Sequence, residues 1–89
     1  MDENTLHKKI NELEFPTEWT YTIIGVEKAL MTAAVESIIT TEKYTLRDSK
    51  RSSGGKYLSL EIHLRVQNKE QKDHFYTALA SNKDIKIVL

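Results

Sequence analysis

The chain of 89 residues contains no cysteine, a single proline and three glycines. Without thiols it can form neither a disulfide nor a thiolate metal site. No stretch approaches the roughly 20 consecutive apolar residues that a membrane-spanning helix needs. The first nine residues also lack the apolar segment of a secretory signal peptide. These absences predict a cytoplasmic protein that makes no contact with a membrane.

An excess of charge of either sign is also lacking, because 13 lysines and arginines balance 13 acids. The charges are unevenly placed, since residues 1–18 are acidic and residues 43–56 are basic. A basic segment attracts anions, but a chain without net charge is not typical of a dedicated nucleic-acid binder. We interpret residues 43–56 as a solvated hairpin kept soluble by its charges, and nucleic acid is not the partner that we expect.

Residues 52–66 combine a turn with the longest strand pattern in the sequence. Polar or amphipathic residues occupy every odd position from 57 to 65, and apolar residues occupy every even position from 58 to 66. Side chains alternate between the two faces of a strand, so one face of this strand must be covered by a core. The predicted core side chains are Leu58, Leu60, Ile62, Leu64 and Val66.

Hydrophobic periodicity and turn residues indicate the other elements. We expect a short helix or arm at 3–14, a strand at 18–25, a helix at 27–39, a strand at 43–49 joined by a turn at 50–55 to the long strand, a helix after residue 68, and a strand at 85–89. The order β-α-β-β-α-β predicts an α+β, ferredoxin-like fold with a four-stranded antiparallel sheet and two helices on one face. The expected division is an N-terminal arm at 1–16 and one domain at 17–89.

Finer expectations concern single side chains. Asn68 and Gln71 have the spacing of a capping box that opens the second helix. Trp19 and Tyr21 are expected to point into the core with Ile23. In the first helix, the side expected to face the sheet carries Val26, Leu30, Ala33, Ala34 and Ile38, widened by Met31 and Val35.

The turn at 52–56 has the glycine, hydroxyl and lysine content of a phosphate cradle. In a P-loop, however, a serine or threonine follows the lysine and a helix follows the loop. Here Tyr57 follows the lysine and a strand follows the turn, so a plain hairpin turn is the favoured interpretation. The segment 55–62 distantly echoes an RNA-binding strand, although Ser59 replaces an aromatic residue and Glu61 adds a negative charge. A weak RNA contact module that uses the basic 43–56 hairpin and Tyr57 therefore stays open as an alternative.

No set of residues forms a catalytic signature. The three histidines, His7, His63 and His74, lie on separate predicted elements without metal-ligand spacing. No pattern places a serine beside a histidine and a carboxylate. We expect no enzyme activity, no bound metal and no cofactor.

Four stretches together resemble the YbeD-like family of small bacterial proteins. They are Leu-Glu-Phe-Pro-Thr at 13–17, Thr20-Tyr21, Ser-Ser-Gly-Gly-Lys-Tyr-x-Ser at 52–59 and Asp-Ile-Lys-Ile-Val-Leu at 84–89. The resemblance spans nearly the whole chain. It implies a largely uncharacterised cytoplasmic protein with a fold similar to ACT regulatory domains, and a link to lipoate metabolism has been proposed for the family. It supplies no catalytic residue.

The function that this sequence favours is a non-catalytic regulatory or interaction module that binds a small ligand or a protein partner. A homodimer formed through open sheet edges is a further alternative. The surfaces that we expect to make contact are the loop after the first strand and the hairpin. Their residues are Gly25, Arg47, Lys50, Arg51, Ser52, Ser53, Gly54, Gly55, Lys56 and Tyr57.

Overall fold

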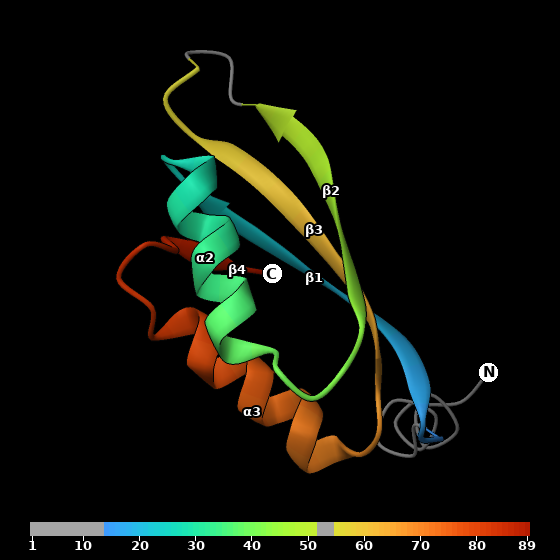
Figure 1. The fold of residues 1–89 in the computed structure, drawn as a ribbon. Helices are drawn as coiled ribbons and strands as arrows, with labels where there is room; N and C mark the ends of the chain where they lie inside the picture. The colour runs from blue at the N-terminus through green and yellow to red at the C-terminus, as the bar shows by residue number, and fades with distance from the viewer. Residues whose placement is uncertain (1–13, 52–54) are drawn as a thin grey trace, which may run out of the picture.

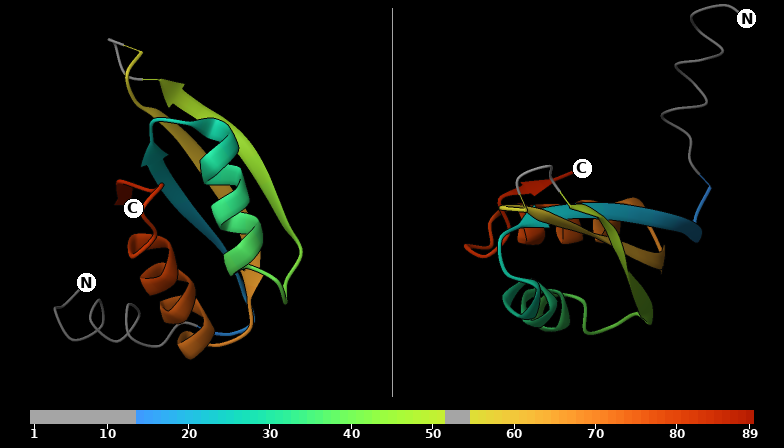
Figure 2. Two further views of the ribbon diagram at one scale, coloured as in Figure 1. Left: turned by 60° about the vertical axis from the view of Figure 1, so that its left-hand side comes forward. Right: turned by 90° about the horizontal axis from the view of Figure 1, so that it is seen from above.

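A computed structural model describes residues 14–51 and 55–89, so the arm expected at 3–14 lies almost entirely outside the described residues, as do Ser52, Ser53 and Gly54. The elements are β1 (Thr17–Gly25), α2 (Lys28–Ile38), β2 (Tyr44–Arg51), β3 (Leu58–Val66), α3 (Lys69–Ala80) and β4 (Ile87–Val88) (Figure 1). The strands form one antiparallel sheet in the order β2-β3-β1-β4. Both helices lie beneath the same face of this sheet (Figure 2). The predicted ferredoxin-like α+β fold is confirmed.

The core lies between the sheet and the helices, and β3 supplies its centre. All five even-numbered side chains from Leu58 to Val66 are buried, whereas the odd-numbered ones are half-buried or exposed. Strand β1 runs beside β3 over its full length and buries Tyr21 and Ile23, while Trp19 is half-buried. The alternation predicted for residues 57–66 is therefore confirmed, and the opposite face of the sheet is left open.

Helix α2 is rotated relative to the prediction. Val26 is 50% exposed and Leu30 is 45% exposed, and Ala33 is exposed as well, so the expectation that these residues face the sheet was wrong. The buried stripe instead runs through Met31, Ala34, Val35 and Ile38, spaced i, i+3, i+4 and i+7. The sequence offers two overlapping stripes, and the one that packs against the sheet contains Met31 and Val35 in place of Val26, Leu30 and Ala33.

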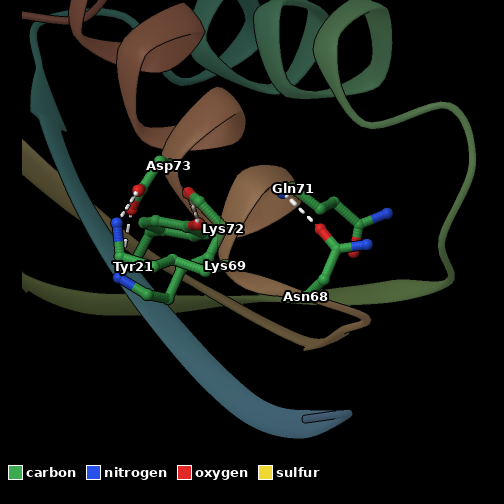
Figure 3. A network of polar contacts seen from close by, with 6 residues as sticks. All are labelled: Tyr21, Asn68, Lys69, Gln71, Lys72 and Asp73. Carbon is green, nitrogen blue, oxygen red and sulfur yellow. Dashed lines mark hydrogen bonds and ion pairs between the residues drawn. The ribbon is translucent and has the colours of Figure 1, made fainter. Parts of the chain in front are cut away.

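Helix α3 begins at the predicted cap. The side chain of Asn68 accepts a hydrogen bond from the backbone N–H of Gln71 at 2.7 Å (Figure 3). The reciprocal bond differs from a standard capping box, because the Gln71 side chain accepts from the N–H of Gln67, also at 2.7 Å. Within the first turn, the Lys72 carbonyl accepts a hydrogen bond from the Tyr21 hydroxyl of β1 at 2.5 Å. This bond fixes α3 to the central part of the sheet.

The two outer strands differ in length from the prediction. Strand β2 continues two residues beyond Ser49, with a register shift against β3 between Asp48 and Arg51. Strand β4 is regular only at Ile87–Val88, so the strand expected at 85–89 is too long. The reason is local, because Ile85 turns into the core and the N–H of Lys86 already donates to the Ile24 carbonyl. None of the helices in the described part of the chain combines the length and apolar content needed to cross a lipid bilayer.

Candidate functional site

A polar cluster occupies the centre of the open sheet face. His63 of β3 is bonded on both ring nitrogens, with Nδ1 lying 3.0 Å from the hydroxyl of Thr20 and Nε2 lying 3.1 Å from a carboxylate oxygen of Glu61. The three residues come from the adjacent strands β1 and β3, where Thr20 pairs with His63 and Thr22 pairs with Glu61. A neutral ring that carries its proton on Nε2 satisfies both bonds.

This cluster has the residue types of a nucleophile, base and carboxylate triad, but its surroundings do not fit catalysis. The His63 and Glu61 side chains are 36% and 38% exposed on a flat sheet face, and Thr20 is exposed. Acyl transfer depends on hydrogen-bond donors preorganised around the reacting oxygen in a site that excludes water. Across the residues that the structure describes, no three His, Asp or Glu side chains gather closely enough to hold a metal ion.

An apolar hollow lies at one end of the open face, where Ile24 of β1 pairs with Ile87 of β4. It has a volume of about 350 Å³ and is lined by Ile24, Tyr57, Lys86 and Ile87. Ile24 of β1 and Ile87 of β4 are cross-strand partners, and Tyr57 directly precedes β3. Tyr57 and Ile87 are 37% and 50% exposed, which is high for large apolar side chains. Strands β1, β3 and β4 thus present apolar groups to solvent at one corner of the sheet.

Two lysines flank this hollow. Lys86 belongs to its lining, and the Nζ atom of Lys56 lies 5.3 Å from the centroid of the Tyr57 ring, a distance typical of a cation–π contact. Among the lining residues that the structure describes, none carries an acidic side chain. The chemistry favoured at this corner is therefore an apolar group next to a negative charge.

The two surfaces predicted from the sequence meet at the same end of the sheet. Gly25 of β1 and Arg51 of β2 are both register partners of Leu58, so the loop after β1 and the hairpin lie side by side. Tyr57 lines the apolar hollow, and Gly55 has a left-handed backbone with φ of 70°. Five of the predicted contact residues are not fully described. The side chains of Lys50 and Arg51 lie outside the described part of the structure, and so do the whole residues Ser52, Ser53 and Gly54.

Arg47 and Gly25 are not among the residues that line the hollow. Arg47 is the register partner of Glu61, which places it beside the polar cluster. Gly25 is buried, and a Cβ atom there would lie 2.8 Å from the Asp84 carbonyl oxygen and 2.8 Å from the Met31 sulfur. Close packing between β1, α2 and the loop before β4 accounts for this glycine, and its contact with a ligand stays a prediction.

Two further hollows are more polar. One, of about 290 Å³, is lined by Leu58, by Ser49 and Ser59, and by Lys28 and Asp48, whose side chains form an exposed ion pair at 2.9 Å. The other, of about 320 Å³, lies at the far end of β2 and β3 and includes Lys43, Glu18 and Arg65 in its lining. Charged groups in both linings are already close to charges of opposite sign, because Arg65 and Glu18 also approach to 4.0 Å.

Sequence reasoning missed three residues of the apolar hollow: Ile24, Lys86 and Ile87. A signal existed for Ile24, because an apolar side chain on the second face of an alternating strand has no core to enter. The hollow as a whole is assembled from residues 24, 57 and 87, which are brought together by the pairing of β1 with both β3 and β4. No local pattern in the sequence reports that pairing.

The chain is similar over nearly its whole length to small bacterial proteins. The pattern of a family described as "Protein of unknown function (DUF493)" matches residues 11–89. A "UPF0250 protein" of Shewanella sediminis is 35% identical over 94% of this chain and 99% of its own length. A "UPF0250 protein" of Haemophilus influenzae is 31% identical over 98% of this chain and 97% of its own length.

Solved structures agree on the fold. The solution structure of protein HP0495 from H. pylori matches with a TM-score of 0.75, covering 88% of this chain and 86% of the other. The sequences are 16% identical, so the similarity concerns the arrangement of strands and helices. A second solution structure of HP0495 from Helicobacter pylori matches with a TM-score of 0.60.

Proposed function

This chain belongs to the DUF493 family of proteins of unknown function, and we propose a role for it from the features of its own surface. The proposed role is a non-catalytic regulatory or interaction module. The observation that supports this role is the apolar hollow formed by Ile24, Tyr57 and Ile87 with Lys86. The side chains of His63 and Glu61 in the polar cluster are partly open to water.

The binding energy available at the hollow comes from its apolar side chains. Covering apolar surface contributes about 25 cal/mol per Å² removed from water, and Tyr57 and Ile87 each leave more than a third of their surface exposed. Aromatic side chains at the centre of a contact are frequent binding hot spots. A group that fills the hollow would gain from this burial, and an anion beside it would also meet Lys86 and Lys56.

The contacting group is therefore apolar and adjacent to a negative charge. A protein side chain next to an acidic residue has this chemistry, and so does a small amphipathic anion. The cytoplasmic location, the link to lipoate metabolism and the RNA contact alternative stay predictions.

An amide NMR titration with the dye anilinonaphthalene sulfonate tests this surface directly, because the dye joins an apolar ring system to an anion. We expect the largest shift changes at residues 24, 57, 86 and 87. Tyr57→Ala should weaken dye binding several-fold by removing one wall of the hollow. Lys86→Glu should also weaken it, since the sulfonate would then meet a carboxylate.

The matched control is Tyr76→Ala. Tyr76 is a tyrosine on α3 that is 48% exposed, so this change removes a comparable side chain far along the sequence from the hollow. Shift changes centred on Thr20, Glu61 and His63, or equal weakening by both tyrosine substitutions, would contradict the proposed site.

A further inference from the structure

The two edges of the sheet are built differently. Strand β2 at one edge carries Arg47 and Asp48 and has a register shift against its neighbour. Charged residues and irregular pairing are features by which natural sheets block edge-to-edge association. The β4 edge is protected in another way, by its length of two residues and the neighbouring Lys86. It nevertheless presents Ile87 and Leu89, which are 50% and 71% exposed.

The backbone of β4 has one residue oriented for outward pairing. Leu89 and Thr22 of β1 exchange two hydrogen bonds, with N···O distances of 2.7 and 3.1 Å. In an antiparallel ladder the next pair, Ile23 and Val88, is then a pair without mutual hydrogen bonds. Val88 therefore directs its N–H and C=O away from β1, toward the outer side of the sheet.

A second copy of the same edge complements this arrangement. If two β4 strands run antiparallel about a twofold axis, the Val88 residues can exchange both of their backbone hydrogen bonds. In that register Ile87 faces Leu89 of the second copy, and Leu89 faces Ile87. Both residues lie on the open face, because their partners Ile24 and Thr22 do. The apolar side chains of one copy thus meet those of the other.

Charge also favours this register. Lys86 is the charged residue next to the pairing segment, and in the symmetric arrangement the two Lys86 residues lie at opposite ends of it. Four residues along a strand separate them by roughly 13 Å, which exceeds the screening length of about 8 Å at physiological salt. A register shifted toward Lys86 would bring the two ammonium groups closer together.

We propose that β4 pairs antiparallel with β4 of a second copy, Val88 against Val88, so that two four-stranded sheets become one eight-stranded sheet. This inference goes beyond the proposed function, since it concerns the backbone edge of the sheet. It also places the two apolar hollows on one continuous face. The contact is short, so it is expected to be transient and concentration-dependent.

Sedimentation equilibrium at protein concentrations up to about 1 mM measures the association. We expect a monomer–dimer equilibrium that Ile87→Glu and Leu89→Lys each weaken about tenfold, because each puts a charge opposite an apolar side chain. An equimolar mixture of the two variants should associate again. In the mixed dimer the new carboxylate faces the new ammonium group, and the second site keeps its original Ile87–Leu89 contact.

Matched controls place the same charges on exposed apolar residues outside the pairing segment. Val26→Glu and Leu30→Lys alter exposed apolar residues of the α2 segment that are 50% and 45% exposed. Both should leave the equilibrium unchanged. A chain that stays monomeric at the highest concentration, a dimer that the controls disrupt, or a mixture that fails to associate would each overturn the proposal. If the chain stays monomeric, the β4 edge would instead be available to pair with an extended segment of another protein. If the wild-type protein dimerises but does not bind the dye, that result would count against the proposed function and leave the proposed dimer standing.

Discussion

Gly25 is the residue at which three parts of the fold come together. It ends β1, and it is buried between the Met31 side chain of α2 and the carbonyl of Asp84 in the loop before β4. A methyl group there would lie 2.8 Å from an atom on each side. The Asp84 oxygen belongs to the backbone, so a change of side-chain rotamer cannot relieve the close contact with it.

We predict that Gly25→Ala lowers the free energy of unfolding by about 1–3 kcal/mol, the usual cost of overpacking a closely fitted interior. Urea denaturation followed by circular dichroism measures this cost. In a Met31→Ala background Gly25→Ala should cost less but still destabilise, because the clash with the Asp84 backbone remains. A cost below about 0.5 kcal/mol would show that this packing is not as tight as described.

Tyr21 links pH to stability at the same scale. Burial, followed by the nearby negative charge of Asp73, raises the pKa of the Tyr21 hydroxyl to about 12. In the unfolded chain this group titrates near 10, so the folded state retains its proton between pH 10 and about 12. Its contribution to stability is therefore complete below pH 10 and is lost as the pH rises through this window.

We predict that wild type loses roughly 2 kcal/mol more stability than Tyr21→Phe across this alkaline window. Below pH 10 the variant should be less stable by about 1 kcal/mol, since the bond to the Lys72 carbonyl is missing. Denaturant unfolding of both proteins at a series of pH values gives the two curves. Parallel curves throughout would mean that Tyr21 does not titrate in this way.

At the scale of one element, the start of α3 shows how a single side chain stabilises a helix. Asn68 accepts the hydrogen bond from Gln71 N–H that would otherwise be unsatisfied in the first helical turn. We predict that Asn68→Ala costs about 1 kcal/mol of stability, and that Asn68→Asp keeps most of it because a carboxylate also caps and favours the helix N-terminus. Thermal unfolding of the three proteins distinguishes them. An Asn68→Ala protein as stable as wild type would show that the cap has no part in stability.

Helix α2 and strand β4 show why some elements were predicted less well than α3. The cap at Asn68 depends on residues three positions apart, so the sequence contains all of it. The orientation of α2 depends on which stripe fits the sheet, and Ala34 and Ile38 belong to both stripes. The length of β4 depends on Ile85 entering a core that three other elements create.

At the scale of the whole molecule, the fold rests on the period of two in β3. Every other side chain of this strand is buried, and β3 lies between β1 and β2 in the sheet. The sequence predicted this architecture because a strict alternation over nine residues fits only a strand with one covered face. It could not predict the apolar hollow, which joins residues from three strands that are distant in the chain.

We predict that substitutions at neighbouring positions of β3 differ sharply in how much they lower the free energy of unfolding. Ile62→Ala should lower stability by about 2–5 kcal/mol, because Ile62 is fully buried and leaves a cavity. His63→Ala should cost less than about 1 kcal/mol, since its side chain is partly in water. Chemical denaturation compares the two. Equal costs, or a reversed order, would contradict the assignment of the two faces.

The claim on which the functional account depends is that the corner at Tyr57 is where the molecule meets its partner. Photo-cross-linking in cells tests it most directly, with benzoylphenylalanine placed at position 57 and, in a separate protein, at position 76. Both positions carry exposed tyrosines, so the probe replaces a similar ring in each. We expect a discrete covalent adduct from position 57, to a second copy, another protein or a small molecule, and none from position 76. Adducts from position 76 alone, or from neither position, would contradict it.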